Sequence, residues 1–388
     1  MTRSPFRYLD HNATTPPHPD VLAAIADASR EAWANPASLH RAGREARRRV
    51  EDARAAIAAL AGVSERDVVL TSGGTEANNL GLERPFAARR GLLVTSRLEH
   101  PSIVEKAEAL AAEGVRVAWL PVGPTGHLVV DDVAAALGGR APGEPTLVAV
   151  HAVHHETGAI QPIAAILALA ARLGAEVHVD AVQAAGRVDA ALWRGGDTAA
   201  LAAHKLRGPK GIGALVTRPG IVVRPILRGG SQERGLRPGT IDPAAAAGFE
   251  VAARRALDGP LRYAALAELR DGVEASARAA GARHGVALSV ASSEPRASHV
   301  AHLVVDGWSG DELVAALDLE GVCVSSGAAC SAGTAEPSPA IVAMLGAHAG
   351  GAVRVSLGET STEADIAAFA EALDRVLGRT PPKPSRDP

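Results

Sequence analysis

Short apolar runs alternate with segments of helical spacing through the first two thirds of the chain. The apolar runs predict buried strands over 68–72, 92–96, 115–122, 146–153, 176–182 and 197–204. Between most of these runs, as in 102–113 and 163–173, apolar residues recur at helical intervals. Strands that alternate with helices form mainly parallel sheets, so we predict an α/β fold whose large sheet is covered by helices on both faces.

The pattern changes near residue 240. A long helical run over 244–283 is followed by short strands and further helices, which is typical of an α+β unit. A length of 388 residues also suits two domains. We therefore predict a large domain over 15–255, a smaller α+β domain formed by 1–14 and 256–379, and a disordered Pro-rich tail over 380–388.

Charge and composition narrow the possible partners and location. The net charge of −3 is spread along the chain, which argues against a nucleic acid or a membrane surface as partner. The first residues have no apolar core typical of a signal peptide, and the most apolar helix, 163–173, is too short to span a bilayer. Only two cysteines are present, which excludes a disulfide framework. We therefore predict a cytoplasmic protein.

A lysine stands where one predicted strand ends. The chain has four lysines, and Lys205 follows the apolar run 197–204 and precedes a Gly/Pro turn. Lysine is rarely buried unless it is paired, so this position needs a reason. A partly desolvated amine loses its proton more easily and can form a Schiff base with an aldehyde. The alternative is a surface turn with two basic residues, Lys205 and Lys210.

Two further strand ends carry candidate ligands. Gly73, Gly74 and Thr75 join a strand to a helix, where backbone N–H groups can approach a phosphate. An ordinary capped glycine turn is the alternative. Asp180 ends an apolar strand, and a carboxylate there suits a cationic partner such as a protonated pyridine nitrogen. The alternative for Asp180 is a helix N-cap.

The two cysteines differ in their surroundings. Cys330 lies among Ser, Gly and Ala, a composition that suits an exposed nucleophile, although an incidental thiol is the alternative. Cys323 lies in apolar VCV and is expected to be a packed strand residue. The His-rich stretch HAVHHETG, 151–158, ends a strand and has no known metal-ligand spacing, so we predict no metal.

A phosphate turn, a strand-end aspartate, a histidine for stacking and a strand-end lysine together describe a pyridoxal phosphate site. The chain also resembles the cysteine desulfurases, fold-type I enzymes of the class V aminotransferases. The matching stretches, in family order over about residues 8–375, are YLDHNATTP, NPASLH, TSGGTEANN, TSRLEHPS, HETGAIQPI, HVDAVQAAG, HKLRGPKGIG, GGSQERGLRPGT, SSGAACSAGTAEPS and VRVSLG.

The resemblance implies a role for each residue around the cofactor ring. Lys205 forms the Schiff base, and His100 stacks on the ring and moves protons. Asp180 pairs with the pyridine nitrogen, and Gln183 bonds the ring oxygen. His155 stands near that oxygen, where the family usually has asparagine, and is expected to titrate near its reference pKa of about 6.5.

The resemblance also implies the phosphate site, the substrate site and the nucleophile. The phosphate is held by Gly74, Thr75, His204 and, from the other subunit of a homodimer, Thr240. The substrate carboxylate is taken by Asn35 and Arg354. Cys330 attacks the sulfur of L-cysteine and becomes a persulfide, leaving L-alanine. Ala202 replaces the usual serine, which removes one phosphate hydrogen bond.

The family function has alternatives. A related lyase or transaminase on the same scaffold, such as a selenocysteine lyase, is the first, and the thiol of Cys330 argues against a transaminase. The second is a weakened homologue that acts as a partner protein, which the departures at His155 and Ala202 favour. The sulfur acceptor stays open between an iron–sulfur scaffold, a tRNA-thiolation enzyme and other proteins.

Overall fold

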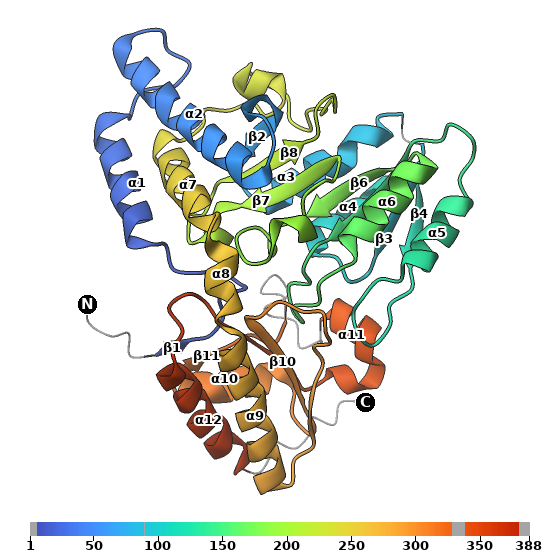
Figure 1. Cartoon of the computed structure of the whole chain (residues 1–388), viewed down its shortest axis with the longest axis vertical. Helices are drawn as coiled ribbons and strands as arrows, with labels where there is room; N and C mark the ends of the chain where they lie inside the picture. The colour runs from blue at the N-terminus through green and yellow to red at the C-terminus, as the bar shows by residue number, and fades with distance from the viewer. Residues whose placement is uncertain (1–5, 89, 328–337, 380–388) are drawn as a thin grey trace.

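The computed structural model describes residues 6–88, 90–327 and 338–379 (Figure 1). Its large sheet runs in the order β2-β8-β7-β6-β5-β3-β4. The strands are β2 (Val68–Thr71), β3 (Leu92–Ser96), β4 (Arg116–Leu120), β5 (Thr146–His151), β6 (Glu176–Asp180), β7 (Thr198–Ala202) and β8 (Gly213–Thr217). Strands β4, β3, β5, β6 and β7 are mutually parallel, whereas β8 is antiparallel to both β7 and β2. The predicted, mainly parallel sheet is therefore confirmed.

Helices cover both faces of this sheet. One face packs against α2 (Arg41–Ala61), α5 (Val130–Gly138), α6 (Ile163–Leu173) and α7 (Pro243–Ala256). The other face packs against α3 (Gly74–Glu83) and α4 (Pro101–Ala112). Successive residues of β3 show the alternation: Leu92 and Val94 belong to the first core, and Leu93 belongs to the second. Helix α1 (Pro19–Glu31) lies against α7 at the outer edge (Figure 1).

A second core surrounds a smaller sheet of order β12-β10-β9, all antiparallel. Its strands are β9 (Leu288–Val290), β10 (Val300–Val305) and β12 (Ala352–Ser356). Helices α7, α8 (Gly259–Ala264) and α9 (Ala267–His284) run in succession from the large sheet towards the small one (Figure 1). Helices α10 (Gly310–Leu319) and α12 (Glu363–Leu377) also contribute to this core, whereas the buried residues of α11 (Pro339–Leu345) belong to the first core.

The two ends of the chain meet in the second core. Strand β1 (Arg7–Tyr8) pairs in parallel with β11 (Val322–Cys323), and Leu9 is buried among residues of the C-terminal helices. This arrangement accounts for grouping the first residues with the C-terminal part. The domain limits themselves stay a prediction. No helix within the described ranges is both long and apolar enough to span a membrane.

Candidate active site

A cavity of about 220 Å³ lies at the carboxyl ends of β5, β6 and β7. The strand register sets His151 beside Asp180 and Asp180 beside Ala200, so polar residues that end different strands reach the same edge. The sequence-predicted residues that line it are Gly74, Thr75, His100, His155, Asp180, Gln183, His204, Lys205 and Arg354. The structure therefore brings together nine predicted site residues from six separate stretches of the sequence.

Asp180 is held by a chain of buried polar groups. It is 6% exposed, and its two carboxylate oxygens accept hydrogen bonds from Asn78 Nδ2 at 2.8 Å and from the Val182 N–H at 2.9 Å. Asn78 Oδ1 lies 2.9 Å from His178 Nε2, and His178 Nδ1 lies 2.8 Å from Thr198 Oγ1. Burial lowers the pKa of His178 to about 4, so its ring is neutral. The carboxylate therefore faces the cavity in a fixed orientation.

Lys205 follows β7 in the short 3-10 segment Ala203–Leu206. Its Nζ donates hydrogen bonds to the carbonyl oxygens of Asn12 at 2.5 Å and Ala13 at 2.8 Å. The same Asn12 carbonyl accepts from Gln183 Nε2 at 3.0 Å. The loop after β1 thus orients the lysine, which excludes the surface-turn alternative, whereas Lys210 is exposed.

The start of α3 forms an anion cradle at one end of the cavity. Helix α3 begins at Gly74, and a Cβ added there would lie 2.7 Å from Val182 Cγ2, so the backbone approaches closely only because this residue is glycine. Thr75 lies within the first turn, and Nδ1 of His204 is 3.1 Å from Thr14 Oγ1. Ala202 lines the same cavity and supplies no hydroxyl there.

Two histidines of the cavity, His100 and His204, are held in their neutral forms. Burial lowers the pKa of His100, with the charge of Lys205 acting in the same direction and Asp180 opposing it. His100 caps α4, its Nδ1 accepting from the Ser102 N–H at 3.1 Å. Burial and the charge of Lys205 lower the pKa of His204 to about 4. A neutral ring can accept a proton at neutral pH, as a general base must.

The expectation that His155 titrates near 6.5 is wrong. Burial, followed by the charges of His100 and Arg354, lowers the pKa of His155 well below its usual value. Its ring meets that of His100 edge to face, with centroids 5.6 Å apart. The sequence showed the substitution of asparagine by histidine but could not show how completely this side chain is buried.

Arg354 reaches the cavity from β12 of the small sheet. Its guanidinium donates to the His155 carbonyl at 3.0 Å and pairs with Asp10 Oδ1 at 2.6 Å. Its Nε is buried and has no hydrogen-bond partner among the described residues. Because a guanidinium carries five N–H donors, this arginine keeps donors for a carboxylate ligand.

The arrangement fits pyridoxal phosphate. The donor set combines a glycine cradle for a phosphate, a fixed carboxylate for a pyridine nitrogen and a strand-end amine for an aldehyde. A profile of the family "Aminotransferase class-V" matches residues 7–369 of this chain.

The chain belongs to the class-V aminotransferases, among the cysteine desulfurases. It is 38% identical over 383 residues to the IscS-like cysteine desulfurase of Mycobacterium tuberculosis, covering 96% of each chain. A solved NifS-like protein superposes with a TM-score of 0.85 at 27% identity, covering 96% of this chain and 99% of that one. A solved structure of SspA in complex with cysteine superposes with a TM-score of 0.75 at 26% identity, covering 92% of this chain and 100% of that one. The family resemblance and the fold class predicted from the sequence are therefore confirmed.

Two predicted site residues of this desulfurase chain lie elsewhere. Asn35 and Thr240 both line a second cavity, of about 490 Å³, together with Arg54 and Glu233. Both are exposed. Within one chain, therefore, the structure does not bring Asn35 to Arg354. Thr240, expected to act from another subunit, likewise lies away from its own chain's cofactor cavity.

The predicted nucleophile, Cys330, lies outside the described residues. Cys323 is in β11 and half-buried, so the expectation of a packed residue is only partly met. Burial, followed by the charge of Asp318, raises the pKa of the Cys323 thiol. A raised pKa leaves less thiolate, which disfavours Cys323 as a nucleophile.

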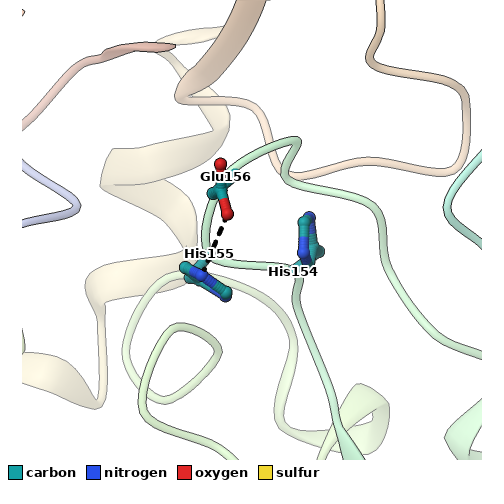
Figure 2. A group of neighbouring side chains, drawn as sticks. All are labelled: His154, His155 and Glu156. Carbon is teal, nitrogen blue, oxygen red and sulfur yellow. Dashed lines mark ion pairs between the residues drawn. The ribbon is translucent and has the colours of Figure 1, made fainter. Parts of the chain in front are cut away.

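Three residues of the His-rich stretch, His154, His155 and Glu156, form a compact buried group (Figure 2). Donor atoms of His154, His155 and Glu156 lie within 4.8 Å of one another and could hold a metal ion. His155 Nε2 is 3.3 Å from Glu156 Oε1, and that oxygen also accepts from Ser338 Oγ at 2.5 Å. The prediction that no metal binds here stays a prediction.

Sequence reasoning missed the residues that support the site. Asn12 contacts Lys205, Gln183, His155 and Arg187, although it stands in a loop with common turn residues. Asn78 was part of a recognised motif, but no role was assigned to it. Asparagine is a poor helix former, so an asparagine on the buried face of a predicted helix is a signal that could have identified Asn78.

Proposed function

We propose that this chain is a pyridoxal phosphate-dependent cysteine desulfurase that converts L-cysteine to L-alanine. The observation that carries the proposal is the single cavity in which Lys205, Asp180 and His100 meet, in a chain of this family. The relatives named cysteine desulfurase and the neighbour with bound cysteine support L-cysteine as the substrate.

When bound, pyridoxal phosphate supplies a sink for electrons from the α-carbon of an amino acid. Asp180 would face the pyridine nitrogen, and its bonds from Asn78 and the Val182 N–H keep the carboxylate in place. Gly74, Thr75 and His204 would hold the phosphate. Lys205 would attach the cofactor, and the carbonyls of Asn12 and Ala13 fix the direction of its amine. Gln183 would bond the ring oxygen, with His155 beside it.

Substrate positioning and sulfur transfer involve Arg354, His100 and Cys330. Arg354 would bind the substrate carboxylate through donors that its pair with Asp10 leaves available. His100, neutral at physiological pH, would accept a proton from a thiol. The thiolate of Cys330 attacks the substrate sulfur: an S–S bond forms, the C–S bond breaks, and a proton replaces sulfur on the departing alanine carbon. The enzyme thiol becomes a persulfide, so no external oxidant is needed.

The active protein is proposed to be a homodimer. Thr240 is exposed and distant from its own chain's cofactor cavity, which suits a residue that completes the phosphate site of a second copy. Asn35 lies in the same second cavity and is proposed to serve the substrate site by the same route. The neighbouring exposed Trp33 and Leu39 give this surface an apolar component.

Three further features belong to the proposal. The chain is divided into a large domain over 15–255 and a small domain formed by 1–14 and 256–379. It acts in the cytoplasm, which suits two cysteines that must stay reduced. The persulfide passes to an acceptor protein, such as an iron–sulfur scaffold or a tRNA-thiolation enzyme.

The proposal is tested by incubating the cofactor-loaded protein with L-cysteine and dithiothreitol and quantifying alanine and sulfide. Equal amounts of both products are expected, because each turnover releases one alanine and transfers one sulfur. Pyruvate and ammonia in place of alanine would indicate a lyase, and a keto acid without sulfide would indicate a transaminase. Cofactor binding without turnover of cysteine would identify a weakened homologue.

A further inference from the structure

Glu156 is a buried carboxylate to which the proposed mechanism assigns no role. It is 0% exposed and follows β5 in the loop that carries His154 and His155. Its Oε1 lies 3.3 Å from His155 Nε2, and His155 lines the cofactor cavity. Figure 2 shows this contact as a dashed line.

The other side of Glu156 faces the two chain ends that flank 328–337, the segment containing Cys330. Ser338 Oγ donates to Oε1 at 2.5 Å. A Cβ added to Gly327 would lie 3.2 Å from Glu156 Oε2 and 3.2 Å from Ser338 Cβ. Residues 327 and 338 therefore lie next to each other, and both pack against one carboxylate.

The Ser338 side chain does not make the capping hydrogen bond that is usual for a serine at its position. Ser338 is the N-cap of α11, where serine commonly accepts a hydrogen bond from a backbone N–H of the first turn. Its side chain makes no such capping bond here. The hydroxyl is instead directed to Glu156, so the start of α11 is attached to the loop after β5.

We propose that Glu156 is a positioning residue that couples the imidazole of His155 to Ser338, and so couples the cofactor cavity to the anchor of the Cys330 segment. The inference rests on the proposed function. A carboxylate oxygen 3.3 Å from Nε2 favours the tautomer of the neutral His155 ring that carries its hydrogen on Nε2, because an ionised carboxylate only accepts. Removing either contact changes how the other partner is held, because both use the same oxygen, Oε1.

The coupling is tested with Ser338→Ala and its hydroxyl-retaining control Ser338→Thr, in a Cys323→Ser background that leaves Cys330 as the only thiol. Two quantities are measured at neutral pH: the absorbance spectrum of the protein loaded with pyridoxal phosphate, without cysteine, and the rate of Cys330 alkylation by iodoacetamide. Ser338 does not line the cavity, so a changed spectrum would report an effect transmitted from outside the cavity, and the double variant with Glu156→Gln shows whether Glu156 transmits it.

We expect Ser338→Ala to shift the spectrum and change the alkylation rate about fivefold, as for loss of one hydrogen bond, and Ser338→Thr to restore both. Glu156→Gln should alter both quantities, and adding Ser338→Ala to it should change neither further. A spectrum that Ser338→Ala leaves unchanged would overturn the coupling. If Glu156→Gln does not fold, the comparison of Ser338→Ala with Ser338→Thr alone tests the coupling.

One variant separates failure of this inference from failure of the proposed function. If the unaltered protein binds no pyridoxal phosphate, the proposed function fails, and alkylation is then compared in the cofactor-free protein. His155→Asn should still change the alkylation rate of Cys330, because the effect passes through Glu156 rather than through the cofactor. An alkylation rate unaffected by His155→Asn would overturn the coupling in that protein as well.

Discussion

Two cavities differ in how exposed their predicted site residues are. One lies at the ends of β6 and β7, and the other lies beside Asn35 and Thr240. In the first, Asp180 is 6% exposed and is bonded within its own chain. In the second, Asn35 and Thr240 are exposed, and the nearby Trp33 and Leu39 are 75% and 82% exposed. The polar groups that line the first region are held within one chain, whereas the second combines a buried Arg54–Glu233 ion pair with the outward-facing Asn35 and Thr240.

We interpret the first cavity as the site of the chemistry and the second as part of the proposed dimer interface. A preorganised site needs buried partners that hold each group in place, and Asn12 and Asn78 provide them. A surface that carries an exposed tryptophan beside exposed polar groups is typical of an interface. We therefore expect substitutions in the first region to change cofactor binding and substitutions in the second region to change the strength of the dimer.

The largest effect is expected at Lys205. Lys205→Ala removes the amine that faces the cavity and should abolish the absorbance band of the lysine-bound cofactor. Lys210→Ala is the matched control, because it removes an exposed lysine from the same turn and should leave the band unchanged. If Lys210→Ala abolished the band and Lys205→Ala did not, the attachment site would be assigned wrongly.

A large effect on assembly is expected at Trp33. Trp33→Glu should weaken the dimer about 30-fold, the cost of losing an aromatic interface residue worth about 2 kcal/mol. Sedimentation velocity over a concentration series measures this. Leu319→Glu is the control, because Leu319 is 83% exposed but lies on α10 of the other core. An unaltered protein that is monomeric and active would contradict the proposed assembly.

A moderate effect is expected at Asn78. Asn78→Ala removes the bond to Asp180 and leaves a buried carboxylate oxygen unsatisfied, so the dissociation constant of pyridoxal phosphate should rise about tenfold. Fluorescence titration of the cofactor-free protein measures it. The adjacent Asn79→Ala removes a bond to the Thr75 carbonyl on the partly exposed side and should change affinity little. Equal effects of the two variants would contradict the assigned role of Asn78.

The smallest effect concerns buried neutral histidines such as His302 of β10. Burial lowers the pKa of His302 to about 4, with Glu156 raising it and Arg354 lowering it. The unfolded chain binds this proton at a higher pH than the folded chain does. Stability is therefore complete above about pH 6.5 and declines as pH falls towards about 4.

The free energy of unfolding falls between about pH 7.5 and about pH 5.5 in part because the unfolded chain protonates His302. In His302→Leu this fall should be smaller by about 1 kcal/mol. Both ring nitrogens are buried without a hydrogen-bond partner among the described residues, so an apolar side chain of similar size can replace the ring. Urea unfolding of the unaltered protein and the variant at both pH values gives the difference. An unchanged pH dependence would show that His302 is not the titrating group.

The sequence predicted the strands and helices closely because their apolar patterns are strong. The helix over 163–173 has the predicted limits, and the strand ends at Asp180 and before Lys205 place both residues in one cavity. The partners of individual side chains could not be predicted from such local patterns. Asn12 is separated from Lys205 by most of the chain, and no local pattern indicates that its carbonyl faces that amine.

The behaviour of His155 also required the structure. Its reference pKa predicted titration near neutral pH, whereas burial, followed by the nearby His100 and Arg354, lowers the pKa of His155 well below that value. Asn35 and Thr240, which are proposed to act across a dimer, were assigned to the site from the family motifs alone. Their separation from the cofactor cavity became visible only when the chain was folded.

The central claim is that this cavity serves a desulfurase whose thiol is Cys330, and mass spectrometry of the protein after exposure to L-cysteine tests it most directly. The account predicts a mass increase of one sulfur atom on Cys330 in the unaltered protein and in Cys323→Ser. Cys330→Ser should bind cysteine without forming a persulfide or releasing sulfide. Undiminished sulfide release by Cys330→Ser would contradict the account and would indicate a lyase that needs no enzyme thiol.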